Sequence, residues 1–381
     1  VLGSDELRRL RAPAHQALLE QAVALARRLD PRLRLATDLL SRLAAPGLLE
    51  KLRGGGFRAD DPLVAAARLL RDRLLEGEAP GDEDVRSTAL GRRIAAVHLS
   101  SARPLAPRAA TRAGAPRHLQ VLYHRDSEGW GAYLRRTGRP LHRLPLPGVE
   151  AALREAWWPL RLLLESAAHR APQRRGPFLD RTRAEAESAL EQLRTALLEP
   201  LGLEEESRVE VVPYGPLHDL PLEALLLGGD REVRVSRWPH PGFRPEPGRA
   251  APRRALLLHD GRAASLREVE GVGRRLRRAG WSVRRGSRRA DLDQPPQGLV
   301  HLAAHGVRHP QRWLLNGIRL VDGWLGFEQL PRRGLRGSLL HLGSCESALG
   351  LEGPGAEAEG WVAAGLGRGA REMILTLWKV D

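Results

Sequence analysis

The stretch from residue 254 to residue 378 contains five short apolar runs, and their alternation with helical sequence restricts the fold more than any other feature of the chain. The runs are RALLLHD, WSVRRG, GLVHLAA, RGSLLHLGS and REMILTLW. Between the first two lies ASLREVEGVGRRLRRAG, whose spacing predicts a helix with Leu266, Val269, Val272 and Leu276 on one face. Near-continuous apolar strands separated by helices predict an α/β fold with a mostly parallel sheet covered by helices on both faces.

Chemically active side chains follow two of these runs. His305 and Gly306 come directly after GLVHLAA, and Cys345, the only cysteine of the chain, comes directly after RGSLLHLGS. In open α/β sheets ligands bind beyond the carboxyl ends of the strands. If the two strands are neighbours, a thiol and an imidazole project over the same edge, as a nucleophile and its base require. The alternative is that Cys345 packs as a small apolar residue, and without further support the alternative is favoured.

The chemistry of such a pair follows from protonation. A free thiol has a pKa near 8.5, so a nucleophilic cysteine needs a neighbouring imidazole or an electropositive site. His305 could accept the thiol proton and later donate it to a leaving amine. Gly306 has no side chain, so its N–H could approach a carbonyl oxygen and form an oxyanion hole with the N–H of Cys345.

The rest of the chain predicts two further regions. Residues 1–110 show helical periodicity, and ALLEQAVALARRLDP is similar to the second helix of a tetratricopeptide repeat. A Pro- and Arg-rich linker is expected at 111–117. Residues 118–245 contain the paired strands HLQVLYH and GAYLRR, two long amphipathic helices of which the second closes on Gly202, and the strand RVEVVP. Residues 246–381 hold the parallel-sheet pattern.

Composition limits the class of protein. Hydrophobic residues make up 42% of the 381 residues and charged residues 28%, which is typical of a globular protein with a sizeable core. No apolar run approaches the roughly 20 residues of a membrane helix and no signal peptide opens the chain, so we expect a soluble, cytoplasmic protein. A single cysteine excludes an internal disulfide and a multi-cysteine zinc site, and we expect neither a metal nor an organic cofactor.

The net charge of +15 raises the question of nucleic-acid binding. All but two of the 61 basic residues, Lys51 and Lys379, are arginines, and these are spread along the whole chain among acidic residues. This distribution favours a compositional bias of the coding sequence. Nucleic-acid binding stays a minor alternative that would need arginines clustered in three dimensions. The chain starts at Val1 and stops in the apolar run LTLWKVD, so we expect a fragment truncated at the C-terminus.

Four stretches, in order and at matching spacing, resemble one family. They are VVPYGPLHDLPLEALL, LVHLAAHG, LLNGIRLVDGWLGFEQL, and LHLGSCESALG followed by GLGRGAREMILTLWKVD. From about residue 118 onward the chain is similar to the CHAT family of caspase-like cysteine peptidases, which are related to separases and often fused to tetratricopeptide repeats. The resemblance implies a caspase-like sheet preceded by an all-α region, with 118–245 as a pseudo-caspase companion half and 246–381 as the catalytic half.

The resemblance also implies an activity. It makes the protein a cysteine endopeptidase for limited proteolysis of a protein substrate in bacterial signalling or defence, with a regulatory partner bound by the N-terminal helices. It assigns His305 as general base and acid, Cys345 as nucleophile and Gly306 as an oxyanion donor. Ser347 and Ala348 stand where the family usually has Thr and Gly, which puts the fit of the substrate in doubt. The competing interpretation is a non-catalytic scaffold on the same fold.

Four other residues have open interpretations. Asp381 could line a substrate pocket and favour Arg or Lys before the scissile bond, but a position at the start of the next loop is favoured. His301 is interpreted as a packed, hydrogen-bonded residue of the sheet. His259 is interpreted as a loop residue. His341 occupies a strand position where an apolar residue is expected, and the sequence offers no function for it.

Overall fold

The computed structural model describes residues 118–126, 128–136, 139–170, 177–203, 208–227, 233–239, 252–293, 298–307, 316–331, 335–345, 347–348 and 360–378. The helical region predicted at 1–110 and the linker at 111–117 lie outside these ranges. Within them, no helix is long and apolar enough to cross a membrane.

The first half of the described chain forms a five-stranded sheet in the order β3-β2-β1-β4-β5. Its strands are β1 (His118–Asp126), β2 (Gly129–Arg136), β3 (His142–Pro145), β4 (Arg208–Val212) and β5 (Arg234–Arg237). β1 pairs with β2 in antiparallel register and with β4 in parallel register. The pairing of the first two predicted strands is therefore confirmed.

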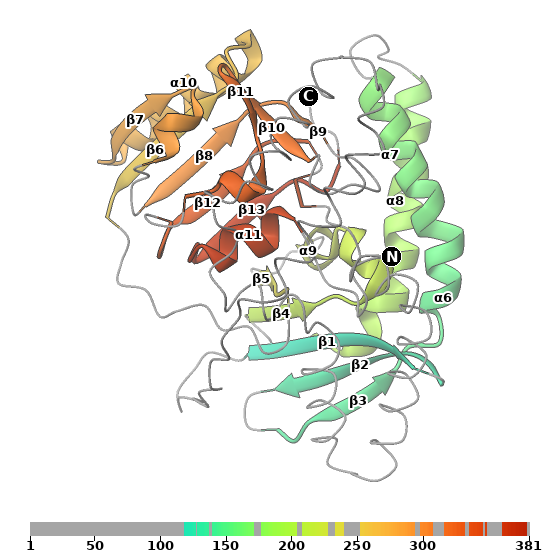
Figure 1. Cartoon of the computed structure of the whole chain (residues 1–381). Coiled ribbons are helices and arrows are strands. Elements are labelled where there is room, and N and C mark those ends of the chain that lie inside the picture. Colours follow the sequence, from blue (N-terminus) through green and yellow to red (C-terminus); the bar gives the residue numbers. More distant parts are fainter. Residues whose placement is uncertain are drawn as a thin grey trace, which may run out of the picture.

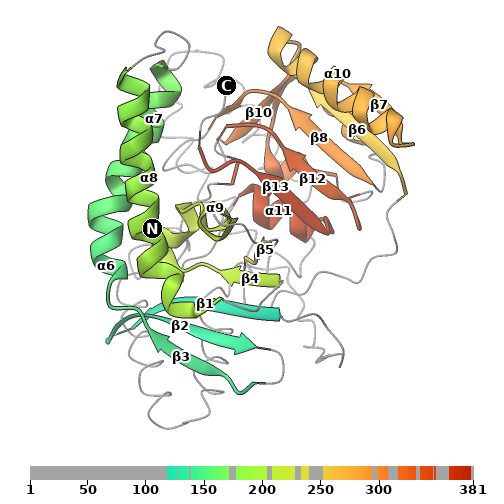
Figure 2. The same cartoon turned by 180° about the vertical axis from the view of Figure 1, so that it is seen from behind.

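Two long helical segments follow β3 and lie side by side (Figures 1 and 2). The first consists of α6 (Val149–Ala152), the π-helical turn η1 (Leu153–Trp157) and α7 (Trp158–Arg170), and the second is α8 (Pro177–Leu197). After α8 comes the short turn η3 (Glu199–Leu201), closed by Gly202 in the left-handed conformation at φ 58°. This ending agrees with the predicted glycine stop, because glycine adopts a left-handed φ without steric cost. The short helices η4 (Gly215–Asp219) and α9 (Leu222–Leu227) follow β4.

The second half contains a five-stranded sheet in the order β13-β12-β8-β6-β7 in which every pairing is parallel (Figure 1). Its strands are β6 (Arg254–His259), β7 (Ser282–Gly286), β8 (Leu299–Ala303), β12 (Leu339–Leu342) and β13 (Glu372–Leu375). All five lie in the five predicted runs. The mixed α/β fold with a parallel sheet is thereby confirmed for the described residues.

The two faces of this sheet bury alternate residues of the same strands, as the period of two in a strand requires. Leu256, Val300 and Leu340 belong to one core, which also contains Trp361 and Ala364 of α11 (Trp361–Gly367). The opposite face of β6 and β8 packs against α10 (Ala263–Arg278). Covering both faces explains why these strands are almost continuously apolar.

The four residues on the predicted face of α10 are buried to different degrees. Val269 is fully buried and Val272 and Leu276 pack against the same core, but Leu266 keeps 36% of its surface exposed. Leu266 lies in the first turn of α10. Helical spacing identifies a common face of the helix, but it carries no information on where along the helix the sheet ends.

A small antiparallel sheet, in the order β11-β10-β9, joins β8 to β12. Its strands are β9 (Gly306–Val307), β10 (Gly317–Leu320) and β11 (Gly323–Leu325), of which the last two form an antiparallel hairpin. The short helices η5 (Arg289–Leu292) and η7 (Phe327–Gln329) complete the described elements.

We expect Leu302→Ala to lower the free energy of unfolding by about 2–5 kcal/mol, because this fully buried leucine lies on the central strand β8 and its loss leaves a cavity. Urea denaturation followed by circular dichroism measures the change. Leu162→Ala is the control, since Leu162 is 67% exposed and its loss should cost less than about 0.5 kcal/mol. Equal effects of the two substitutions would contradict the assignment of the core.

Candidate active site

The strands that precede His305 and Cys345 are adjacent and in register. Leu302 of β8 is the partner of Leu342 of β12, and the N–H of Gly343 donates to the carbonyl of Leu302 at 2.8 Å. His305 follows Leu302 by three residues, and Cys345 follows Leu342 by the same interval. The condition set by the sequence, that the two strands are neighbours, is therefore met, and both residues leave the sheet at its carboxyl edge.

Gly306 brings the two segments into direct backbone contact. A Cβ atom at this position would lie 2.9 Å from the carbonyl oxygen of Cys345 and 3.1 Å from its nitrogen. It would also lie 3.0 Å from the Cβ of Ser344. Such distances leave no room for a side chain, so the approach of the histidine segment to the cysteine segment requires glycine.

The N–H of Gly306 is directed away from β10. Arg319 donates its N–H to the carbonyl of His305 at 2.7 Å, and Ile318 is the register partner of Gly306. Hydrogen-bonded and non-hydrogen-bonded pairs alternate along an antiparallel ladder. Gly306 thus occupies a non-bonded position, and its N–H is left outside the ladder of the small sheet.

Asp260, at the end of β6, holds the backbone of His305 from the other side. Its Oδ2 accepts the N–H of His305 at 3.0 Å, while its Oδ1 accepts the Ser265 hydroxyl at 2.5 Å and the Arg262 N–H at 3.0 Å. Partial burial disfavours the Asp260 carboxylate, but these hydrogen bonds outweigh it and lower its pKa. Sequence reasoning missed this contact, because the aspartate comes from a different strand and binds a backbone group.

The imidazole of His305 lies beside Trp324, with ring centroids 6.4 Å apart and an interplanar angle of 58°. Partial burial lowers the pKa of His305, the nearby Arg262 cation lowers it further, and Asp260 opposes both. Because the cation is disfavoured, the neutral ring predominates near pH 7. The neutral ring is the form that accepts a proton from a thiol.

The turn that contains Cys345 is tied to the segment after β13. The hydroxyl of Ser347 donates to the carbonyl of Leu342 at 3.1 Å and accepts the N–H of Thr376 at 3.0 Å. The hydroxyl of Thr376 in turn donates to the carbonyl of Ser344. Ser347 therefore supplies a buried hydroxyl at the position where the resembling family usually has Thr.

The remaining candidates are placed as follows. Asp381 lies outside the described residues, so the pocket interpretation stays a prediction. His259 accepts the N–H of Gly261 on its Nδ1 at 3.1 Å, in agreement with a loop role. Among the residues that the structure describes, no three His, Cys, Asp or Glu side chains are grouped as a metal site would need.

Comparison with known proteins finds a family that matches this part of the chain. The family described as CHAT domain matches residues 249–381, which include the whole parallel sheet, the His305 segment and the Cys345 segment. This part of the chain is similar to a CHAT domain. CHAT domains are related to caspase-like peptidases, in agreement with the family that the sequence motifs indicate. No curated protein matches the chain.

Gly306→Ala tests the close contact between the segment of His305 and the segment of Cys345. The added methyl group must push the backbones at Gly306 and Cys345 apart, so we expect a loss of about 1–3 kcal/mol in stability and a changed rate of Cys345 alkylation. Thermal unfolding and iodoacetamide labelling measure the two effects.

Gly271→Ala serves as the matched control. Gly271 lies in α10 with no atom within 4 Å of an added Cβ, so alanine should leave labelling unchanged and stabilise the helix by about 0.5–1 kcal/mol. If both alanine variants label like the wild type, the contact at Gly306 does not shape the site.

Proposed function

We propose that this protein is a cysteine endopeptidase in which His305 and Cys345 form the catalytic dyad. The observation that carries the proposal is the close approach of Gly306 to the backbone of Cys345 and to the Cβ of Ser344. This contact brings the histidine and cysteine segments of the CHAT domain to one edge of a parallel sheet, where α/β proteins bind their ligands.

The first step is acyl transfer. His305 takes the proton of the Cys345 thiol, and the sulfur attacks the carbonyl carbon of the scissile peptide bond. The N–H groups of Gly306 and Cys345 stabilise the oxyanion of the tetrahedral intermediate. As this intermediate collapses, the C–N bond breaks and the His305 imidazolium protonates the leaving amine. The acyl half of the substrate stays on the sulfur as a thioester.

The second step is hydrolysis of that thioester. His305, neutral again, removes a proton from a water molecule, whose oxygen attacks the acyl carbon. The C–S bond then breaks, the carboxylic acid product leaves, and the thiolate recovers the proton from the imidazolium. The lowered pKa of His305 supports this role, because the ring must return to its neutral form in each cycle.

The substrate is proposed to be a protein cut at a limited number of sites. Backbone contacts hold His305 from two elements, through Asp260 and through Arg319, which suits a rigid site that recognises an extended peptide. Asp381 is proposed to favour Arg or Lys before the scissile bond, and a peptide library tests this preference. A regulatory partner bound by residues 1–110 remains part of the proposal.

The competing function is a scaffold that keeps the CHAT fold without catalysis. Reactivity of Cys345 separates the two, because a scaffold needs no activated thiol. Since the chain has a single cysteine, every thiol reagent reports on that residue alone.

We expect His305→Ala to slow alkylation of Cys345 at pH 7 by about 10–100-fold, because the thiol loses the base that generates its thiolate. Peptidase activity should disappear in His305→Ala and in Cys345→Ser, while circular dichroism stays unchanged. His142→Ala is the control, since His142 is an exposed residue of β3, far along the chain from the proposed dyad. A Cys345 that reacts only after denaturation would favour the scaffold.

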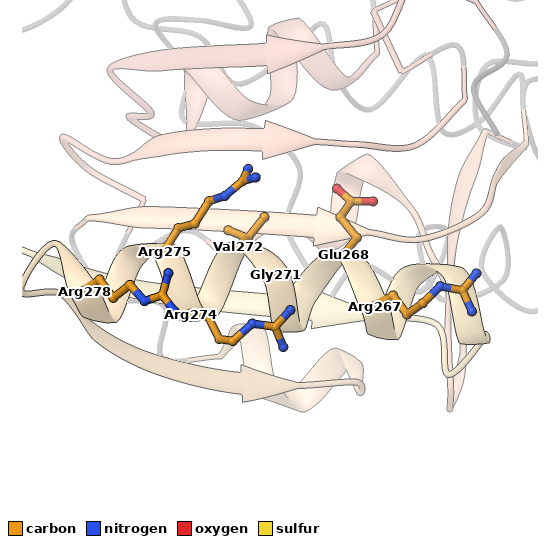
Figure 3. Close-up of a pocket in the computed structure, with 7 residues that line it drawn as sticks. All are labelled: Arg267, Glu268, Gly271, Val272, Arg274, Arg275 and Arg278. Atoms are coloured by element: carbon orange, nitrogen blue, oxygen red, sulfur yellow. The ribbon is translucent and has the colours of Figure 1, made fainter.

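A second candidate function has one observation behind it. Arginines of α10 gather around a pocket of about 300 Å³ (Figure 3). The pocket is lined by Arg267, Glu268, Gly271, Val272, Arg274, Arg275 and Arg278. Arginines grouped in this way would favour nucleic-acid binding, but none of these lining residues is an aromatic ring on which a base could stack.

Nucleic-acid binding at this pocket predicts a salt-sensitive gel shift with single-stranded nucleic acid. Changing Arg274, Arg275 and Arg278 to Gln should abolish the shift, because three phosphate contacts are lost. The matched control changes Arg181, Arg183 and Arg194 of α8 to Gln, which removes the same charge from another exposed surface. Equal weakening by both triple variants, or no shift at low salt, leaves the peptidase as the function of the domain.

A further inference from the structure

Two histidines join the strands that precede His305 and Cys345. His301 of β8 and His341 of β12 are register partners, and their rings are stacked with centroids 4.6 Å apart. The two Nδ1 atoms are 2.7 Å apart, which is hydrogen-bonding distance. His301 is 1% exposed, and His341 is half-buried. The interpretation of His301 as a packed, hydrogen-bonded residue is therefore confirmed, and its partner is the residue that the sequence left unexplained.

Glu268 completes the group from above the sheet. Its Oε1 lies 3.1 Å from Nε2 of His301, and its side chain projects from α10 toward the strands (Figure 3). Gly343 leaves space for this contact, since a Cβ there would lie 3.4 Å from the same oxygen. The contact lowers the pKa of Glu268, first through its hydrogen bond with His301 and against partial burial.

A contact between two Nδ1 atoms allows only one proton between them. The carboxylate of Glu268 favours a proton on Nε2 of His301, so in the neutral pair Nδ1 of His301 accepts and Nδ1 of His341 donates. One further proton is tolerated, because the anionic Glu268 offsets its charge and one Nδ1 still accepts. When both rings are cationic, each Nδ1 carries a hydrogen, and the 2.7 Å contact is lost to repulsion.

We infer that His301 and His341 form a lock between β8 and β12, which is the hydrogen bond through the single proton between their Nδ1 atoms. This lock positions the segments of His305 and Cys345. The hydrogen bond breaks when acid makes both rings cationic. Each histidine precedes its candidate catalytic residue by four positions, the last of which lie beyond the end of β8 or β12. The lock is a positioning device, since it acts on the two candidate residues through the pairing of β8 with β12.

The groups around His341 determine whether acid strengthens or weakens the lock. Partial burial lowers the pKa of His341, His301 lowers it further, and Glu268 opposes both. A histidine whose pKa is lower in the folded state stabilises the fold above its unfolded value of about 6.5, and this stabilisation is lost as the pH falls below it. The other neighbours are uncharged where the strands pair, Leu257 on β6 and Ile374 on β13. Arg275 is the cationic side chain that projects from α10 on the same side as Glu268 (Figure 3).

Hydrogen exchange at pH 7.5 and pH 5.5, corrected for the intrinsic rate, tests the lock without any need for activity. In the wild type, acid should raise the corrected exchange rate of segments 299–305 and 339–345 relative to that of segment 118–126. The expected rise is up to about tenfold per pH unit for each proton taken up on opening. His341→Leu should abolish this rise, because leucine suits an apolar strand position and takes no proton.

Two further variants keep the test decisive. His142→Leu, which removes an exposed histidine of β3, should respond like the wild type. Glu268→Gln should enlarge the rise, because the pair loses the anion that offsets its first proton. The lock is wrong if the rise persists in His341→Leu, or if Glu268→Gln leaves it unchanged.

The consequence for catalysis rests on the proposed peptidase function. His341→Leu should retain a larger share of its neutral-pH activity at pH 5.5 than the wild type does. Absence of peptidase activity in every variant at both pH values would contradict the proposed function and leave the exchange result standing. Identical exchange in wild type and His341→Leu would contradict the lock, whatever the activity.

Discussion

The in-register parallel pairing of β8 with β12 is the constraint on which the rest of the site depends. It sets Leu302 beside Leu342, so the residues that follow each strand leave the sheet at the same height. A slip of β12 by one residue would turn its side chains to the opposite face, moving His341 into the apolar core on the α11 side and away from His301. The pairing therefore fixes the proposed dyad and the histidine lock together, although the two lie at different depths in the sheet.

Beyond the strands, backbone groups hold the site. The N–H of His305 is bound by Asp260 and its carbonyl by Arg319, so the peptide on either side of the imidazole is fixed. The turn of Cys345 is held in the same manner by the Ser347 hydroxyl and Thr376. These contacts position the two segments through the main chain, because each of the hydrogen bonds ends on a backbone group.

The apolar runs predicted the strands of the parallel sheet because a strand buried on both faces must be apolar throughout. They could not establish that β8 and β12 are neighbours, since each run carries the same pattern whatever its order in the sheet. Spacing sets Leu266 on the same face of α10 as Val269, but in the first turn of the helix Leu266 keeps 36% of its surface exposed. Asp260 was missed because its partner is a backbone N–H, which has no letter in the sequence.

His341 shows how a residue that breaks the local pattern can be accommodated. An imidazole inside a sheet loses the hydrogen bonds of water, and that loss destabilises the fold unless a partner replaces them. His301 on the adjacent strand supplies the partner, and Glu268 supplies a charge that sets the tautomer. Two leucines at these positions would fit the apolar pattern and would be insensitive to pH. The polar pair instead makes the pairing of β8 with β12 depend on the number of protons it holds, so the constraint that assembles the site is also the one that acid can weaken.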